Sequence, residues 1–423
     1  MFYIDNTFHR NRVNYVAKEH TSIQSQMVGL NQPITSSQVF MDDSKLLVDF
    51  LQSSKDLFFK SQQNSLFHPT VHFVLGNEAA DMDSIVSSIV VAYSLWKENL
   101  WNENNDSENN LYLPLLNLSK EQISMRKDTL LLLQMLNIPI DALLFSDDVI
   151  QLDSLHDAKK LRLTLVDHNV LKVSQQKFAD VVEGIIDHHK DMGTKYPLLG
   201  DKKIIQTVGS NSTLIVEKLQ KSNLLQNNPS LALLLLAPIL LDTANLQSES
   251  KTTPQDRQAV KELREIIGNP PETFYQSLYD SRHDISDYTT SMLLELDYKE
   301  FCDNEFSYGI SSMLSIAPLW SKQDVDIIKD VEKYVIEKKQ KLLILHMSDD
   351  PKNGENRKII VYSPNPAILA AFNEHVSTNQ ELNSEFKLIS DQNEAMLHYK
   401  LPNNLARKKM QPMFQFPKSF ACL

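Results

Sequence analysis

Apolar runs and helical stretches alternate along the first part of the chain. Each of five short apolar runs is strand-like and ends in polar residues, and they lie at 71–77, 111–117, 161–169, 182–189 and 203–210. Continuous apolar strands separated by helices are typical of a parallel sheet that is covered on both faces. The pattern therefore predicts an α/β fold with a doubly wound, mainly parallel sheet. In such sheets, ligands bind beyond the carboxyl ends of the strands.

A second, smaller α/β domain is predicted in the C-terminal part of the chain. Strand-like runs and helical segments alternate again, at 307–314, 323–339, 341–348, 357–363 and 366–376. The loop 351–356 is expected to join two of these strands as a hairpin. The breaker-rich stretch 268–272 indicates a linker. We therefore predict a flexible N-terminal extension, a first domain, a linker and a second domain, at 1–36, 37–253, 254–273 and 274–423.

The composition argues against a membrane or secreted protein. The longest apolar run, Leu231 to Leu241, is about half of the ~20 residues that a membrane-spanning helix needs. The first residues carry charges and no apolar block, which argues against a secretory signal. The 2 cysteines are far apart in the sequence, as expected in a reducing compartment. We therefore expect a cytoplasmic protein with no membrane contact, and we expect it to be a monomer.

Charge and glycine content restrict the ligands. The formal net charge is −12, which is unfavourable for non-specific binding of nucleic acid. The chain has only 9 glycines, and no glycine-rich phosphate-binding loop of the P-loop or Rossmann type occurs. If the substrate is an anion, then metal ions or a local cluster of basic side chains must hold it.

Acidic residues and histidines follow four of the predicted elements. Asp81 and Asp83 lie on a strand-to-helix turn, Asp167 and His168 end one run, Asp187, His188 and His189 end another, and Asp242 ends a long apolar segment. Taken singly, each group is better explained as a helix cap or a solvated loop. Together they supply the oxygen and nitrogen ligands that suit Mn²⁺ or Mg²⁺. At strand ends that face one cleft, they predict a two-metal site that activates water.

Four of these segments resemble the motifs of a known family. GNEAADMDS (76–84), LVDHN (165–169), GIIDHH (184–189) and LLDTANL (240–246) are similar to the four motifs of the DHH phosphoesterase superfamily. The first and third have the form found in fungal exopolyphosphatases. Later segments, including SRHDIS (281–286) and ARKKMQP (406–412), resemble the DHHA2 branch. The other large branch, which acts on nucleic acids, carries a glycine-rich motif that is missing here.

The resemblance implies a set of metal ligands. Asp81 and Asp167 would hold one ion, and Asp83, Asp167, His188 and Asp242 would hold the other. Asn77 stands where the related manganese pyrophosphatases have a metal-binding histidine. An amide oxygen is a weaker and harder ligand than imidazole, so the first site is expected to bind more loosely and to tolerate Mg²⁺ better.

The resemblance also implies substrate contacts. His189 would contact phosphate, and Asp187 would orient the histidine pair. Arg407 and Lys408 resemble the phosphate clamp of the family, while Arg282 stands at a position that is usually lysine. Arg126 is a possible further anchor. Without the resemblance, Arg407 and Lys408 would be interpreted as a solvated helix face.

The activity implied is that of an exopolyphosphatase, which uses two divalent cations to release orthophosphate from the end of inorganic polyphosphate. The alternatives are a manganese-dependent inorganic pyrophosphatase and a prune-like enzyme for short polyphosphates or phosphodiesters. Asn77 argues against the pyrophosphatase, because a metal-binding histidine stands at this position in that enzyme, whereas His168 argues for it. The intact run Asp187-His188-His189 argues against a prune-like enzyme. A non-catalytic interaction protein on a decayed hydrolase fold is a further alternative.

Overall fold

The computed structural model describes eight stretches of the chain, and the account below concerns these alone: residues 37–63, 68–100, 110–149, 152–200, 202–314, 325–348, 357–393 and 396–423. The predicted N-terminal extension 1–36 and the predicted hairpin loop 351–356 lie outside them. Gln38 to Leu423 form one compact unit. The predicted boundaries between the two domains and their linker stay a prediction.

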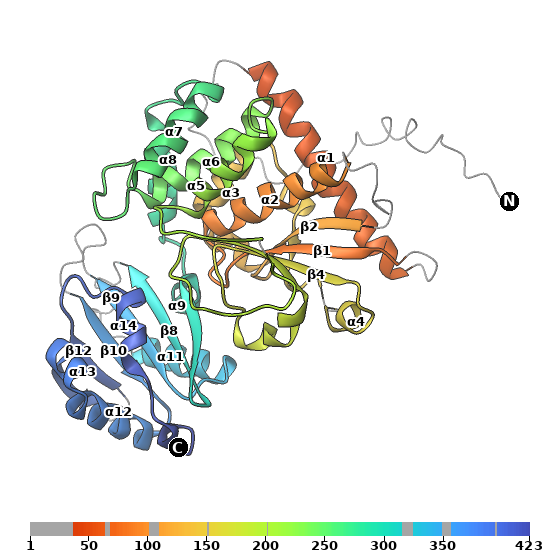
Figure 1. Ribbon diagram of the computed structural model, residues 1–423. Coiled ribbons are helices and arrows are strands. Elements are labelled where there is room, and N and C mark those ends of the chain that lie inside the picture. The colour runs from red at the N-terminus through yellow and green to blue at the C-terminus, as the bar shows by residue number, and fades with distance from the viewer. Residues whose placement is uncertain are drawn as a thin grey trace. The chain divides into compact units, whose positions relative to one another are not determined.

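The first sheet is parallel, and its strand order reverses in the middle. Its six strands have the order β3-β2-β1-β4-β5-β6 and the bounds β1 Thr70–Leu75, β2 Asn110–Leu116, β3 Leu144–Phe145, β4 Leu161–Val166, β5 Val182–Asp187 and β6 Lys203–Ile205. Figure 1 shows β2, β1 and β4 side by side. The loops that follow β1 and β4 run in opposite directions along the sheet, which opens a crevice at their carboxyl ends.

Helices cover this sheet, as the alternating pattern predicts. They are α1 Ser37–Gln63, α2 Met82–Leu100, α3 Lys127–Met135, α4 Leu152–Asp157, α5 Asn211–Leu219, α6 Pro229–Asp242, α7 Pro254–Ile267 and α8 Thr273–His283. Short 3₁₀ segments lie at η3 Gln122–Met125, η4 Ile140–Ala142, η5 Val173–Val181 and η6 Gln220–Ser222. No helix in the described stretches is both long enough and apolar enough to cross a bilayer.

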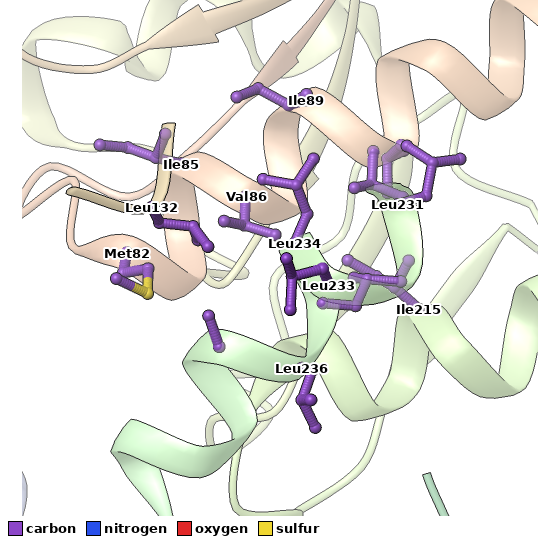
Figure 2. Packing of buried hydrophobic residues seen from close by; sticks show 14 of the residues in the cluster. Met82, Ile85, Val86, Ile89, Leu132, Ile215, Leu231, Leu233, Leu234 and Leu236 are labelled. Carbon is purple, nitrogen blue, oxygen red and sulfur yellow. The ribbon is translucent and has the colours of Figure 1, made fainter. Parts of the chain in front are cut away.

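The apolar run of the sequence forms the centre of the first core. Helix α6 begins with Pro229 in its first turn, where the missing backbone donor costs nothing. Its Leu231, Leu234 and Leu236 are buried in the same apolar cluster as Ile85 and Val86 of α2, and Figure 2 shows these residues. Because α6 is apolar on every side, it packs inside the layer of helices and holds the start of α2 in place.

The second sheet is mixed. Its order is β11-β12-β10-β9-β8-β7, with β8 and β9 parallel and the other neighbours antiparallel, and its bounds are β7 Tyr298–Asp303, β8 Phe306–Leu314, β9 Leu343–Ser348, β10 Lys358–Tyr362, β11 Lys387–Asn393 and β12 Met396–Lys400. The helices of this part are α9 Thr290–Leu296, α11 Val325–Glu337, α12 Pro366–Thr378, α13 Gln380–Glu385, α14 Arg407–Phe414 and the 3₁₀ turn η7 Lys418–Phe420. Separate apolar clusters cover its two faces.

The predicted fold class is confirmed: an α/β protein with a doubly wound parallel sheet followed by a second α/β part. The segment predicted as a linker, 254–273, is largely helical in α7. This helix begins with a capping box between Thr253 and Asp256, and its Ala259, Val260 and Leu263 are buried in the first core.

Candidate metal centre

The predicted acidic residues come together at the crevice of the first sheet. A cleft of about 990 Å³ is lined by Asn77, Asp81, Asp83, Asp167, His188, His189 and Asp242. These side chains follow β1, β4, β5 and α6, four elements that lie far apart in the sequence. The backbone φ is positive at Asp167 itself. It is also positive at Ala80, next to Asp81, and at Ala244, two residues after Asp242. Strained backbone of this kind concentrates at functional sites.

Asp167 occupies the centre of the cluster. It is 2 % exposed and follows β4 with φ of 61°. Its Oδ2 accepts a hydrogen bond of 2.6 Å from Nδ2 of Asn77, whereas its Oδ1 is buried without a hydrogen bond from any described residue. Burial, followed by the charge of Asp81, raises the pKa of Asp167 well above its ordinary value. A buried carboxylate oxygen without a donor needs a positive partner.

His188 presents a nitrogen to that oxygen. Its Nδ1 donates to the carbonyl of Val208 at 3.0 Å, because a carbonyl can only accept. The Nε2 atom lies 3.2 Å from Oδ1 of Asp167. Burial opposes protonation of His188, but the charges of Asp167 and Asp83 outweigh it and raise the pKa to about 10. A histidine that donates one nitrogen to a backbone carbonyl and points the other at a carboxylate has the arrangement of a metal ligand.

His189 is held by the carboxylate behind it. Its Nδ1 and backbone nitrogen both donate to Oδ1 of Asp187, at 2.7 and 3.1 Å. Asp187 is fully buried and also accepts from Asn169. Burial would raise the pKa of Asp187, but the bonds from His189 and Asn169 hold it at about 2. Burial lowers the pKa of His189 to about 4, so near neutral pH its Nε2 carries the lone pair.

Asp81 and Asp83 are fixed by helix N-termini. Oδ1 of Asp81 accepts from the backbone of Ser84 at 3.1 Å, the capping contact that was the alternative explanation of this pair. Asp83 accepts from the backbones of Asn211 and Ser212, at 2.6 and 3.0 Å, and from the Ser212 hydroxyl. Asp83 therefore joins the start of α2 to the start of α5, and burial raises its pKa.

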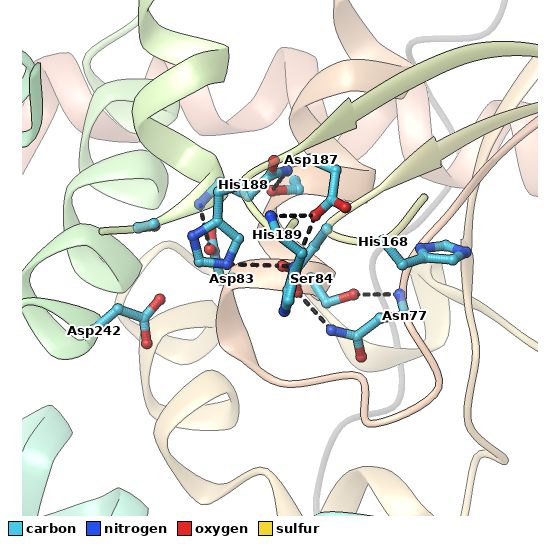
Figure 3. Close-up of polar contacts among 12 residues, drawn as sticks. Asn77, Asp83, Ser84, His168, Asp187, His188, His189 and Asp242 are labelled. Carbon is cyan, nitrogen blue, oxygen red and sulfur yellow. Dashed lines mark hydrogen bonds and ion pairs between the residues drawn. The ribbon is translucent and has the colours of Figure 1, made fainter. Parts of the chain in front are cut away.

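Asp242 ends α6 on the opposite side of the cleft (Figure 3). Burial and the charge of Asp83 raise its pKa to about 7. Arg282 of α8 partly compensates the charge of the Asp242 carboxylate, since its NH1 lies 3.4 Å from Oδ1 of Asp242. The Nε of Arg282 donates to Oδ2 of Asp128 at 2.7 Å. Arg282 is thus shared between two carboxylates.

Two predicted residues have contacts that suit a positioning role. The Oδ1 atom of Asn77 accepts from the backbone of Ala80 at 2.9 Å, and its Nδ2 donates to Asp167. In this orientation Asn77 is a donor that holds Asp167. The Arg126 guanidinium is buried and donates to the carbonyls of Ala79 and Ala80, so it supports the loop that carries Asp81.

The side chains of Arg407 and Lys408, at the start of α14, differ in their contacts. Arg407 donates to the backbone carbonyl of Asp297 at 2.6 Å and to its carboxylate at 2.8 Å. Lys408 lines the cleft with an exposed side chain, and desolvation by the surrounding residues, followed by the charge of Lys299, lowers its pKa. Its charge lowers the pKa of both His188 and His189, which line the same cleft.

The tightest group of possible ligands is Asp167, His188 and His189, whose donor atoms lie within 4.8 Å of one another. Asp81, Asp83 and Asp242 line the same cleft outside this group, and Asp187 lies behind His189. The ring of His168 points away from the histidine pair in Figure 3, and its Nδ1 donates to the carbonyl of Val166. The individual roles predicted for these residues stay predictions.

Sequence analysis missed three contributors to the site. Asp128 pairs with Arg282, Lys299 of β7 lines the cleft, and Ser212 holds Asp83. The signal in the sequence was indirect: the segments 123–128, 209–214 and 294–301, which contain these residues, also resemble the family but carried no named role. Ser212 had the clearest signal, since a serine at a helix start commonly bonds to nearby groups.

Both parts of the chain match families. Residues 72–239 match the family described as "DHH family, N-terminal domain", and residues 276–415 match the "DHHA2 domain". The stretch 72–239 contains Asn77, Asp81, Asp83, Asp167 and the Asp187-His188-His189 run, and the stretch 276–415 contains Arg282, Lys299 and Lys408. The predicted family resemblance is therefore confirmed.

Relatives of known name are similar over most of the chain. The "Exopolyphosphatase PRUNE1" of Mus musculus is 28% identical over 70% of this chain and 64% of its own length. The "Putative exopolyphosphatase" of Schizosaccharomyces pombe is 28% identical over 70% of this chain and 77% of its own length. The chain thus spans slightly less than two thirds of the mouse protein.

One solved structure shows the same fold. The crystal structure of the "putative family II inorganic pyrophosphatase" of Methanococcus jannaschii covers 81% of this chain and 98% of its own, with a TM-score of 0.55 and 23% sequence identity. At this identity the likeness concerns the fold, which agrees with the sheet order and the cleft described above.

Proposed function

Because the chain belongs to the DHH family, with a DHH N-terminal domain followed by a DHHA2 domain, we propose that it is a metal-dependent exopolyphosphatase. The substrate is inorganic polyphosphate, and the product is orthophosphate from the chain end. One observation carries the proposal: Oδ1 of Asp167 is buried without a hydrogen bond and faces nitrogens of both His188 and His189, at 3.2 and 3.5 Å.

These residues fit divalent cations. Four carboxylates, Asp81, Asp83, Asp167 and Asp242, share one cleft with the Nε2 of His188, and crowded negative charge of this kind requires positive charge to balance it. We infer the predicted set of two ions, Mn²⁺ or Mg²⁺, which Asp81, Asp83, Asp167, His188 and Asp242 would hold. When bound, such ions supply a hydroxide nucleophile near neutral pH and neutralise charge on the phosphoryl oxygens.

Side chains around the proposed metal ions would orient the ions and the phosphate chain. The carbonyl of Val208 accepts from Nδ1 of His188, so the ring is oriented with Nε2 towards Asp167, where a bound cation would take the place of the Nε2 proton. Asp187 holds Nδ1–H of His189, so Nε2 is free to take up a proton from solvent when an anionic substrate arrives and to donate it to a phosphoryl oxygen. Lys408 adds positive charge beside the histidines. Positioning and charge compensation of this kind provide most of the catalysis in phosphoryl transfer.

The test compares substrates, metals and one variant. Phosphate release is measured from long polyphosphate, tripolyphosphate and pyrophosphate, each with Mg²⁺ and with Mn²⁺. We expect long polyphosphate to be turned over faster than pyrophosphate and Asp167→Asn to abolish turnover. The matched control is Asp330→Asn, on the exposed side of α11. Faster turnover of pyrophosphate would reassign the substrate, and an Asp167→Asn variant with the wild-type rate would refute the role of Asp167. No phosphate release by the wild type from any of these substrates would support a non-catalytic protein.

A further inference from the structure

A buried carboxylate behind the cleft joins two segments of the first domain. Asp256, in the first turn of α7, is 0 % exposed. Its Oδ2 and Oδ1 accept from the backbone N–H of Gly209 at 2.9 and 3.1 Å, and Oδ1 also accepts from the Thr213 hydroxyl at 2.6 Å. Its Oδ2 accepts from the backbone N–H and the hydroxyl of Thr253, both at 2.7 Å. Asp256 therefore ties residues 208–213, the β6–α5 segment, to the start of α7.

The β6–α5 segment holds two of the predicted metal ligands. The carbonyl of Val208 accepts from Nδ1 of His188 at 3.0 Å. The backbone N–H groups of Asn211 and Ser212 donate to the Asp83 carboxylate at 2.6 and 3.0 Å. These contacts lie one residue before and two and three residues after the glycine that Asp256 holds. A shift of the segment would therefore move a ligand that follows β5 and a ligand on α2 together.

The turn that follows a third predicted ligand, Asp242, packs against the same glycine. Thr243 is fully buried and ends α6. A Cβ added at Gly209 would stand 2.6 Å from Cγ2 of Thr243 and 2.8 Å from Oδ2 of Asp256. The backbone of Gly209 is thus enclosed between the residue after Asp242 and the carboxylate of Asp256. Its place depends on the hydrogen bonds from its N–H to Asp256.

The ligand that was predicted for the other ion alone, Asp81, has separate supports. Its Oδ1 caps the start of α2, and Arg126 donates to the carbonyls of the loop that carries it. The carboxylate predicted for both ions, Asp167, accepts from Asn77. These contacts involve neither Asp256 nor the β6–α5 segment. The two predicted ion sites therefore differ in what holds their ligands.

We propose that Asp256 is a positioning residue for one of the two ion sites, because it holds the β6–α5 segment where Asp83, His188 and Asp242 can bind one cation. The proposal rests on the proposed function, from which it takes the two cations. It goes further by separating them: the ion at Asp83, His188 and Asp242 depends on Asp256, whereas the ion at Asp81 does not. Losing an outer support of this kind lowers metal affinity by roughly 10–100-fold.

The test variant is Asp256→Asn, which keeps the size of the side chain. Because the N–H of Gly209 lies within 3.1 Å of both oxygens, the new amide nitrogen faces this donor in either orientation. Thr253→Ala is the matched control. It removes a hydroxyl that contacts the same carboxylate and caps the same helix, and it leaves the bonds from Gly209 and Thr213 in place.

Binding of Mn²⁺ to the metal-free proteins is measured by calorimetric titration. We expect Asp256→Asn to bind one ion with the wild-type affinity and the other roughly 10–100-fold more weakly. In Thr253→Ala both affinities should stay within about threefold of the wild type, since the β6–α5 segment keeps its carboxylate. If Asp256→Asn does not fold, Gly209→Ala takes its place, because the added Cβ displaces the same segment and should weaken the same ion.

Three calorimetric results overturn the positioning role: two ions bound to the Asp256→Asn or substitute variant as tightly as to the wild type, an equal loss for both ions, or the same selective loss in Thr253→Ala. A wild-type chain that binds no Mn²⁺ contradicts the proposed function itself. Hydrogen exchange of the metal-free proteins then decides on Asp256 separately. Faster exchange at Asn211 and Ser212 in Asp256→Asn than in Thr253→Ala upholds its hold on the segment, and equal exchange refutes it.

Discussion

Replacing Arg282 with glutamine tests whether the main role of this arginine is to stabilise the fold. Its Nε donates to Oδ2 of Asp128 at 2.7 Å, and the Asp128 side chain is only 5% exposed. Removing one partner of a buried ion pair costs roughly 3–5 kcal/mol. The Arg282 side chain is 28% exposed, so screening by water reduces the expected loss to about 2–3 kcal/mol.

The assay is urea unfolding in the presence of a chelator, so that bound cations do not contribute to the free energy of unfolding. Arg257→Gln, at an exposed position of α7, is the matched control and should change stability by less than about 0.5 kcal/mol. The double variant Arg282→Gln with Asp128→Asn should recover at least about 1 kcal/mol, because no buried charge is then left unpaired. Equal stability of Arg282→Gln and the wild type would refute the reasoning and leave Arg282 available as a phosphate ligand.

Three further changes probe other parts of the account. Asp187→Asn should lower kcat/KM for tripolyphosphate by roughly 10–100-fold, since His189 loses the carboxylate that fixes its tautomer; a rate like that of the wild type would contradict this role. Burial lowers the pKa of His72 to about 3, so the folded state resists its protonation. Stability from this residue is therefore complete above the unfolded pKa of about 6.5 and is lost as pH falls towards 3, at up to about 1.4 kcal/mol per pH unit. The stability curve of His72→Gln should be flatter over this range, and parallel curves would refute the assignment. In Gly209→Ala the new Cβ would stand 2.6 Å from Cγ2 of Thr243, so we expect a loss of about 1–3 kcal/mol in thermal or urea unfolding; unchanged stability would show that the contact relaxes at no cost.

The sequence predicted those features that depend on local pattern. Short apolar strands with polar ends gave the parallel sheet, and because the ends of parallel strands meet at one edge, Asp167 and His188 could be expected to lie together. The apolar run from Leu231 to Leu241, which is too short for a membrane span, is buried in α6. These signals arise within a few residues of one another along the chain.

Contacts between distant residues could not be predicted in this way. Asp128 and Arg282 are separated by 154 positions, and neither pattern nor propensity indicates that they pair. The same holds for Asp83, whose donors Asn211 and Ser212 lie on another helix. The resemblance to the family implied that Arg282 and Arg407 bind phosphate, and the carboxylate partners that both have within the protein became visible only in the structure. The position of Lys299 at the cleft became apparent only from the structure, in which it lies on β7.

The central claim is that Asp167 would help to hold each of two divalent cations. Calorimetric titration of the chelator-treated protein with Mn²⁺ tests it most directly, with Asp167→Asn measured in parallel. We expect two ions per wild-type chain and a marked loss of affinity for both in the variant. A wild-type chain that binds no Mn²⁺, or a variant that binds two ions as tightly as the wild type, would contradict the account.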